Sequence, residues 1–197
     1  MKAWASAPTL VGRHVTLRPL DRDDRAALLD AAGDGALHRL FYTGVPSPET
    51  IDGYLDTVMA ERDYGRAMPF AVLDANGGVI GSTRFLRMSR EHRRVEIGAT
   101  FYRRSAQRSA VNTEAKLLLL GHAFDVLGCH VVQIRTDWFN RRSQAAIERL
   151  GAKRDGVLRN HQTAADGRVR DIVVYSIIAS EWPSVRRNLH HLLEQPA

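Results

Sequence analysis

The chain has 197 residues, of which 44% are hydrophobic and 25% charged, and its formal net charge at pH 7 is +6. These proportions are typical of a globular chain and exclude a wholly disordered one. The length predicts a single domain over residues 1–197, large enough to fold without a disulfide or a structural metal. The lone cysteine, Cys129, excludes an internal disulfide and fits a reducing cytoplasm, so we expect cytoplasmic localisation.

The charge pattern limits the classes of partner. The longest stretch without Asp, Glu, Lys or Arg is the ten residues 3–12, whereas a membrane span needs about 18 or more, so we expect no membrane contact. Of the 28 basic residues only Lys2, Lys116 and Lys153 are lysines. Eight arginines lie within residues 84–108. They form either a solvated surface or an anion site, because guanidinium groups match phosphate geometry. No nucleic-acid-binding motif accompanies them, and we do not expect a nucleic-acid partner.

Hydrophobic periodicity and turn residues predict an α/β order of elements. Strands are predicted at 15–20, 69–74, 79–86, 93–102, 130–136, 156–162 and 168–178. Helices are predicted at about 21–32, from Ser47-Pro48 to before Gly65, and at 111–127, 141–150 and 181–193. Asn76-Gly77-Gly78 and Asp166-Gly167 predict hairpin turns. Strand 93–102 alternates, which predicts one face with Val95, Ile97, Ala99 and Phe101 and an opposite face with Glu96, Gly98 and Thr100.

Residues 107–113 join a strand to a long buried helix through small and polar side chains. Free N–H groups at a helix start, together with the helix dipole, can bind an anion. Arg104 and Arg108 add positive charge beside this start. An ordinary helix start with exposed arginines is the simpler interpretation of this stretch taken alone.

The stretch from Asn140 to Gly151 opens a second helix after a strand. Ser143 shares a helical face with core residues, so its hydroxyl points inward and needs a backbone or ligand partner. Asn140 stands in the position of a helix N-cap, which is the simplest role for it.

These features together resemble the GNAT N-acetyltransferase superfamily, and within it the ribosomal-protein alanine N-acetyltransferases and their relatives. The resemblance covers about residues 10–193. It rests on the element order, on the Val111-Asn112-Thr113-Glu114-Ala115-Lys116 run and on the string Asn140-x-x-Ser143-x-x-Ala146-Ile147-x-x-Leu150-Gly151. It implies a mixed, mostly antiparallel sheet of about seven strands, flanked by helices, in which two central strands splay apart.

The resemblance also implies acetyl-CoA as the acetyl donor, with no metal. The family's phosphate-binding loop, Gln/Arg-x-x-Gly-x-Gly/Ala, corresponds to Gln107, Ala110 and Asn112. Ala110 therefore stands where the family has glycine, and its methyl group disfavours positive φ and crowds the phosphate. The residues expected to bind the cofactor are Gln107, Arg108, Ser109, Ala110, Val111, Asn112 and Thr113 in the loop, Ala99, Thr100 and Phe101 on the splayed strand, and Asn140 and Ser143 on the pantetheine arm.

Direct transfer to an amine requires a base for the amine, donors for the oxyanion and a proton for the departing thiolate. We expect Ser143 to donate that proton and Glu96 to act as the base through a water molecule. Glu96 fits an ion pair with Arg93 or Arg94 equally well. Tyr175 is a second candidate for the acid, although core packing explains it better.

The remaining candidates have structural or peripheral interpretations. We expect Cys129 to be a buried small hydrophobe and His190-His191 to be a solvated helix end. His161 could line the acceptor mouth or lie on the surface, and Trp138-Phe139 could wall the acceptor site or cover the core. The loops 41–49, 138–139 and 163–167 are the expected acceptor loops.

The preferred acceptor is the α-amine of a protein or peptide N-terminus, whose pKa of about 8 lies below the value of about 10.4 for lysine. A small-molecule amine is the alternative acceptor. A non-catalytic acyl-CoA-binding protein is an alternative function. The sequence leaves the oligomeric state open, a homodimer included.

Overall fold

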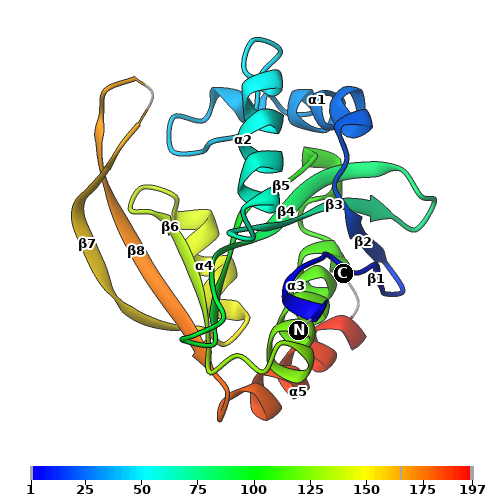
Figure 1. Cartoon of the computed structure of the whole chain (residues 1–197), viewed down its shortest axis with the longest axis vertical. Helices are drawn as coiled ribbons and strands as arrows, with labels where there is room; N and C mark the ends of the chain where they lie inside the picture. Colours follow the sequence, from blue (N-terminus) through cyan, green and yellow to red (C-terminus); the bar gives the residue numbers. More distant parts are fainter. Residues whose placement is uncertain (1, 165, 196–197) are drawn as a thin grey trace.

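The computed structural model describes residues 2–164 and 166–195, and it contains one mixed sheet with helices on both faces. The strand order is β1-β2-β3-β4-β5-β6-β8-β7 (Figure 1). The strands are β1 (Leu10–Val11), β2 (Val15–Pro19), β3 (Met68–Asp74), β4 (Val79–Ser89), β5 (Arg94–Tyr102), β6 (Val131–Asp137), β7 (Lys153–Thr163) and β8 (Val169–Ile178). The helices are α1 (Arg25–Gly33), α2 (Ile51–Asp63), α3 (Ala110–Gly121), α4 (Arg141–Arg149) and α5 (Trp182–Glu194).

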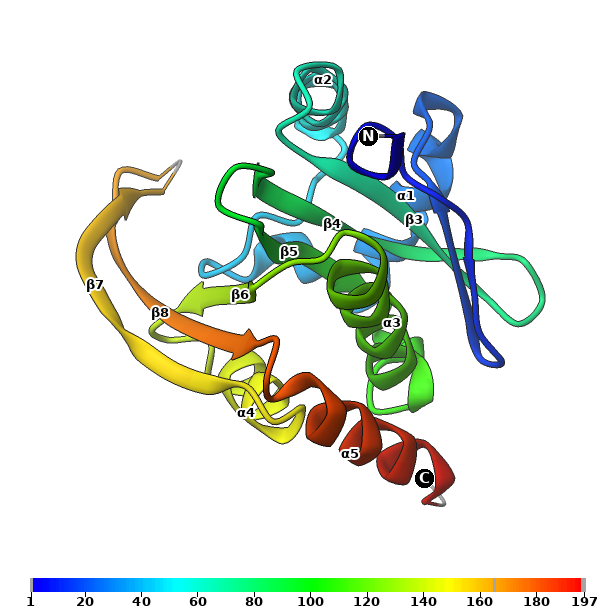
Figure 2. The same cartoon turned by 60° about the horizontal axis from the view of Figure 1, so that its bottom comes forward.

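The helices α1 and α2 cover one face of the sheet, and α3, α4 and α5 lie on the other (Figure 2). The larger hydrophobic cluster lies beneath the second group and includes Leu119, Val132 and Leu189. The smaller cluster joins α1 and α2 to the sheet through residues such as Leu28 and Leu55. In the described part of the chain, no helix combines the length and the apolar character that crossing a membrane requires.

Two of the secondary-structure predictions made from the sequence need correction. The described sheet has eight strands rather than seven, because β1 adds a two-residue strand too short to show a hydrophobic period. Helix α2 begins at Ile51 rather than at Ser47-Pro48. A turn precedes it, in which Thr50 N–H donates to Ser47 O (3.1 Å) and Ser47 N–H donates to Thr50 Oγ1 (2.8 Å). The predicted α/β architecture is otherwise confirmed.

The two halves of the sheet meet at a parallel pair, β5 and β6. Their register runs from Arg94 opposite Val131 to Ile97 opposite Ile134, and the other neighbouring strands are antiparallel. Beyond Ile97, β5 continues against β4 alone, and beyond Ile134, β6 continues against β8 alone. The splayed strand pair that the sequence predicts therefore begins directly after these two isoleucines.

A β-bulge follows this point in β5. Gly98 lies opposite Arg84 and Phe101 opposite Ser82, so β5 holds one more residue than β4 there, and Ala99 has a φ of +47°. The bulge corrects the predicted faces of this strand. Val95 and Ile97 join the cluster beneath α3, whereas Phe101 packs in the cluster beneath α1 and α2. An extra residue reverses the side-chain alternation, which sequence periodicity cannot show.

Gly81 on β4 permits the close approach of the two strands beside the bulge. Its φ is +158°, and a Cβ atom there would lie 2.0 Å from the backbone oxygen of Phe101. Because that oxygen belongs to the backbone, it cannot move aside as a flexible side chain would. Glycine at this position therefore fixes the path of β5 where it leaves β6.

Candidate active site

The N-terminus of α3 has the properties of an anion site. Ser109 is its N-cap, and the Ser109 hydroxyl accepts from Val111 N–H (3.3 Å) and donates to Ala106 O (2.6 Å). The N–H groups of Ala110 and Asn112 lie in the first turn, where a helix supplies no acceptor, and within residues 2–164 and 166–195 neither has another partner. Two N–H donors and the positive end of the helix dipole therefore remain for a ligand.

The left-handed residue of this loop is Arg108 and not Ala110. Arg108 has a φ of +61°, whereas Ala110 is the first residue of α3 and is absent from the positive-φ residues of the described chain. The methyl group at position 110 therefore causes no backbone strain, and the expectation that it would conflict with positive φ was wrong. Arg108 is also exposed at the helix start, where its guanidinium group adds positive charge.

Two side-chain contacts hold α4 against α3. The Gln107 side chain donates to Tyr102 O (2.9 Å) and accepts from Arg142 (3.0 Å). Farther along, Arg149 donates to Thr113 Oγ1 (3.0 Å). The polar side chains of Gln107, Ser109 and Thr113 are thus engaged within the protein, so any contact of these residues with a ligand would use other atoms.

Asn140 and Ser143 lie at the start of α4, directly after β6. Asn140 Oδ1 accepts from Ser143 N–H at 3.1 Å, so Asn140 is the N-cap of this helix. The cap leaves the amide Nδ2 group of Asn140 free of partners among the described residues. The Ser143 side chain is half-buried, and its hydroxyl likewise makes no hydrogen bond in that part of the chain. Both residues therefore present an uncommitted polar group where β5 and β6 diverge.

Glu96 is buried on β5, one residue before the divergence, with a 5% exposed side chain. Its Oε2 atom accepts from Arg87 (2.6 Å) and lies 3.1 Å from Nε of Arg135. The ion pair that the sequence suggests therefore exists, but with Arg87 and Arg135 rather than with Arg93 or Arg94. Glu96 Oε1 lies beside Gly98, since a Cβ atom on that glycine would be 3.3 Å from it. No hydrogen bond joins Glu96 to Ser143 in the described structure.

Behind the bulge lies a polar cluster that the sequence did not indicate. Thr100 Oγ1 is 2.7 Å from Thr83 Oγ1, and it accepts from Lys116 Nζ at 3.3 Å. Lys116 belongs to α3 and is only 4% exposed. The Thr100 side chain therefore points toward α3, on the face opposite to Glu96, because the bulge reverses the alternation.

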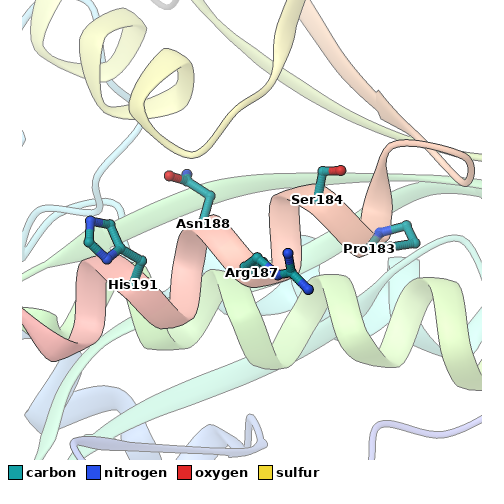
Figure 3. A pocket seen from close by; sticks show the side chains of 5 residues that line it. All are labelled: Pro183, Ser184, Arg187, Asn188 and His191. Atoms are coloured by element: carbon teal, nitrogen blue, oxygen red, sulfur yellow. The ribbon is translucent and has the colours of Figure 1, made fainter.

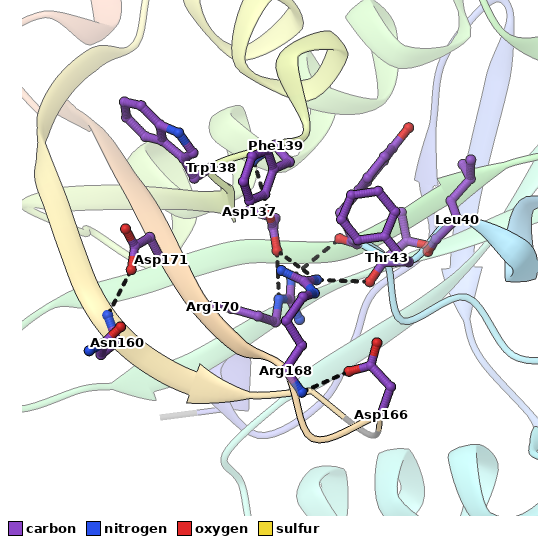
Figure 4. Close-up of polar contacts among 12 residues, drawn as sticks. Leu40, Thr43, Asp137, Trp138, Phe139, Asn160, Asp166, Arg168, Arg170 and Asp171 are labelled. Atoms are coloured by element: carbon purple, nitrogen blue, oxygen red, sulfur yellow. Dashed lines mark hydrogen bonds and ion pairs between the residues drawn. The ribbon is translucent and has the colours of Figure 1, made fainter.

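Two of the predicted acceptor loops, 41–49 and 138–139, contact a cluster centred on Asp137, whose side chain is 1% exposed (Figure 4). The two arginines of this cluster, Arg168 and Arg170, follow the third loop, 163–167, in the chain. Asp137 accepts from Arg170 Nε (2.7 Å) and from Phe139 N–H (2.8 Å), and Arg168 lies 3.5 Å from it. The two arginines also donate to backbone oxygens in the loop between α1 and α2, Arg168 to Phe41 O (3.0 Å) and Arg170 to Tyr42 O (3.2 Å). We call Asp137, Arg168 and Arg170 the Asp137 cluster.

Two aromatic rings stand beside the Asp137 cluster. The rings of Phe41 and Phe139 are 6.2 Å apart and more than half exposed, and the Arg168 guanidinium group lies 4.8 Å from the Phe41 ring centre. Trp138 behaves differently, because it packs against the core with Arg141 and Arg154 over its ring. Of the predicted aromatic pair, Phe139 therefore faces the loops and Trp138 covers the core. Residue 165 of the loop 163–167 lies outside the described residues.

Other candidate residues have structural environments. Tyr175 is fully buried and donates to Glu148 Oε1 (2.9 Å); burial and this carboxylate raise its pKa to about 12. Burial also raises the pKa of the Cys129 thiol to about 12, which makes it inert at neutral pH. His161, His190 and His191 are exposed. Across residues 2–164 and 166–195 there is no group of three metal-ligating side chains.

Two cavities lie away from this region. One of about 500 Å³ runs along α5 and is lined by Pro183, Ser184, Arg187, Asn188 and His191 (Figure 3). Another of about 390 Å³ lies between residues 4–7 and the segments around Pro19 and Met68. Neither includes a residue of the divergence or of the α3 start, so they add nothing to the candidate site.

Comparison with known proteins decides the family. Residues 14–153 match the model of the acetyltransferase (GNAT) domain. The chain belongs to this family. Over 178 residues it is 28% identical to the Bacillus subtilis (strain 168) protein named "Putative ribosomal N-acetyltransferase YdaF", covering 87% of this chain and 95% of that one. The protein is thus an acetyltransferase of the GNAT family, as the sequence resemblance predicts.

Solved structures of other proteins also resemble this chain. A "putative acetyltransferase" from T. thermophilus superposes with a TM-score of 0.84 at 36% identity, over 96% of this chain and 99% of that one. Mycobacterium smegmatis RimJ, solved in complex with CoA-disulfide, has a TM-score of 0.78 over 96% of each chain. At 23% identity this second likeness shows the GNAT fold alone.

Proposed function

We propose that this GNAT acetyltransferase moves an acetyl group from acetyl-CoA directly to a primary amine, preferably the N-terminal α-amine of a protein or peptide. The observation that carries the proposal is the divergence of β5 and β6 after Ile97 and Ile134, with the starts of α3 and α4 beside it. The strand edges of residues 98–101 and 135–137 do not pair with each other there. Such edges offer N–H and C=O groups to an extended ligand.

The residues present fit the charge and shape of the cofactor. Acetyl-CoA supplies the acetyl group as an activated thioester. The free N–H groups of Ala110 and Asn112 would bind the pyrophosphate, with the guanidinium groups of Arg108 and Arg142 nearby. The unpaired edge of Ala99, Thr100 and Phe101 would hold the pantetheine arm, and Asn140 would donate to it from Nδ2.

Two side chains are assigned to proton transfer. Ser143 Oγ, which has no protein partner in the described chain, would donate a proton to the departing thiolate. Glu96 would accept the amine proton through a water molecule at Oε1, since Oε2 is occupied by Arg87 and Arg135. The ion pair orients the carboxylate, so the two interpretations of Glu96 are compatible.

The acceptor is proposed from its chemistry and from the loops. An α-amine with a pKa of about 8 is partly deprotonated at neutral pH, so a base acting through water suffices, whereas lysine near 10.4 would need a stronger one. The Asp137 cluster joins the loops 41–49 and 138–139 to the residues that follow the loop 163–167, with Phe41 and Phe139 exposed beside it. The name of the B. subtilis relative favours a ribosomal protein as the substrate.

A thiol-release screen tests this function. Acetyl-CoA is incubated with the enzyme and peptides, free amino acids, polyamines or aminoglycosides, and the modified atom is located by mass spectrometry. We expect release with peptides that have a free N-terminus and none with the same peptides blocked there. If thiol is released only with small amines, the acceptor is a small-molecule amine and not a protein N-terminus. If the protein binds acetyl-CoA but releases no thiol with any acceptor, a non-catalytic acyl-CoA-binding protein is favoured.

The domain limits and the location in the cell are part of the proposal. We infer that the acetyltransferase core extends from about residue 10 to 193 of the 197 residues. The single, buried and reduced Cys129 supports a cytoplasmic location.

A further inference from the structure

Lys116 is a buried cation without an anionic partner. It lies on α3 among core residues and is 4% exposed, and its one hydrogen bond in the described chain goes to Thr100 Oγ1 (3.3 Å). No carboxylate of the described residues lies within 4.0 Å of its Nζ atom. Lysine is rarely buried unless it is paired, because removing an ammonium group from water is costly. Burial alone lowers the pKa of Lys116 to about 8.

The charged groups that contact α3 near Lys116 in the described chain have partners of their own: Glu114 accepts from the N–H groups of residues 13–15, and Arg149 donates to Thr113 Oγ1. The elements packed around α3 present a shared apolar cluster to the helix, whose members include Val15, Leu17, Ile97, Val185 and Leu189. Tyr102, whose pKa is raised by burial, and His122, whose pKa is lowered by burial, are also buried on this side. Neither makes a hydrogen bond to Lys116, and neither carries a charge at neutral pH.

The partner of Lys116 belongs to the candidate site. Thr100 directly follows Ala99, the left-handed residue of the bulge, and its hydroxyl also contacts Thr83 on β4 and approaches Gly98 O (3.5 Å). Lys116 thus connects α3 to β5 and β4 at the residues where β5 leaves β6. A non-glycine residue with positive φ persists only where its surroundings hold it, and the hydrogen bonds of Thr100 lie directly beside Ala99.

The position along α3 relates Lys116 to the proposed phosphate site. Six residues separate it from Ala110, which corresponds to about 9 Å along the helix axis. Charges at such a distance interact appreciably through a protein interior, where screening by water is weak. An apolar side chain would fill the same space without the desolvation cost, so stability does not explain a lysine here.

We propose that Lys116 is a positioning residue of the acetyl-CoA site: it holds the bulge at residues 98–100 through Thr100, and its positive charge is balanced by the phosphates of the bound cofactor. The inference rests on the proposed function, because it assumes that acetyl-CoA binds at the start of α3. It predicts that the unliganded protein bears a cost in stability that cofactor binding offsets.

The test compares Lys116→Met with Lys153→Met, a matched change of an exposed lysine on β7. Acetyl-CoA binding is measured by calorimetry without acceptor at pH 7 and pH 9.5, a range in which the cofactor phosphates stay ionised. We expect Lys116→Met to raise the melting temperature of the unliganded protein, to bind acetyl-CoA about tenfold more weakly at pH 7 and to lose the pH dependence of binding. The wild type and Lys153→Met should bind more weakly at pH 9.5 than at pH 7.

Thr100→Val is a second, independent test, because it removes the hydrogen bond between Thr100 and Lys116 and keeps the positive charge of Lys116. It should lower kcat while retaining the pH dependence of acetyl-CoA binding. Wild-type binding and wild-type kcat in both Lys116→Met and Thr100→Val would overturn the inference and leave Lys116 as a lysine of the core. A wild-type protein that binds no acetyl-CoA at either pH would instead overturn the proposed function.

Discussion

Gln107 accepts a hydrogen bond from Arg142 at 3.0 Å, which joins the loop before α3 to the first turn of α4. The same glutamine donates to Tyr102 O at the end of β5 (2.9 Å). One side chain therefore connects the proposed phosphate site, the splayed strand and the helix that carries Ser143. These contacts within the protein hold the three parts in their relative placement.

Ala110→Glu tests the phosphate site, because it places bulk and negative charge beside the free N–H groups of Ala110 and Asn112. It should abolish coenzyme A binding in calorimetry while changing the melting temperature of the unliganded protein by less than about 2 °C. Ala26→Glu, an exposed alanine on α1, is the matched control and should bind normally. Ala110→Gly should leave affinity near the wild-type value, because Ala110 is helical and not strained. Normal binding by Ala110→Glu would place the phosphates elsewhere.

Ser143→Ala tests the proton donor. The hydroxyl has no partner in the described chain, so its removal should leave stability nearly unchanged and lower kcat about 10²-fold or more. The affinity for acetyl-CoA should stay within about twofold, since the hydroxyl acts on the departing thiolate. Ser184→Ala on α5 is the control. Unchanged turnover in Ser143→Ala would assign this serine to helix packing.

A comparison of Glu96→Gln with Arg87→Met distinguishes a role of Glu96 as the catalytic base from a role in the ion pair alone. Both variants remove the ion pair between Glu96 and Arg87, but only the first removes the carboxylate that would accept the proton. We expect Glu96→Gln to lower kcat about 10²-fold or more, most strongly at low pH, where the acceptor amine holds its proton. Arg87→Met should lower kcat by less than about fivefold. Equal losses in the two variants, with equal losses of melting temperature, would leave the ion pair as the only role.

Asp137→Asn tests whether the Asp137 cluster holds the predicted acceptor loops in position. Removing the buried charge leaves Arg168 and Arg170 without their shared anionic partner, at a cost of about 3–5 kcal/mol in unfolding free energy. The KM for a peptide acceptor should rise, whereas the dissociation constant of acetyl-CoA should not change. Asp63→Asn, an exposed residue at the end of α2, is the control. A loss of acetyl-CoA affinity with an unchanged acceptor KM would separate the Asp137 cluster from acceptor binding.

The lowered pKa of Lys116 predicts that the stability of the folded protein depends on pH. Its pKa is about 8 in the folded protein and near 10.5 in the unfolded chain, so between these values the unfolded state binds more protons. Lys116 therefore contributes stability that grows as pH rises from about 8 to 10.5. Chemical denaturation at pH 7.5 and pH 10 should show a smaller gap in stability between Lys116→Met and the wild type at the higher pH. A gap that does not change with pH would contradict the buried environment of Lys116.

Local patterns were sufficient to predict most elements. The alternation in 93–97, the Asn76-Gly77-Gly78 turn and the helix that follows Asn140 all depend on neighbouring residues, and the structure contains each of them. The two-residue strand β1 has no period to detect, and the bulge requires positive φ at Ala99, a residue type that gives no warning of it. The predicted side-chain face therefore failed from Ala99 onward.

The site depends more on contacts between distant residues. Glu96 pairs with Arg87 on β4 and Arg135 on β6, whereas the arginines next to it in sequence are exposed. Which residues of the neighbouring strands lie beside Glu96 depends on strand order and register, which the residues around Glu96 do not reveal. The burial of Lys116 and the Asp137 cluster likewise arise only when separate segments pack together. The loop 107–113 could be proposed as the phosphate site from sequence because all of its residues are consecutive.

The most direct test of the account is a calorimetric titration of coenzyme A into the wild-type protein, with a parallel measurement of the melting temperature. We expect one site per chain and a melting temperature that rises with ligand concentration, since a ligand that binds only the folded state stabilises it. No detectable heat and no thermal shift at about 1 mM coenzyme A, a concentration that would reveal even a weak site, would contradict the assignment of residues 107–113 and of the splayed strands to the cofactor.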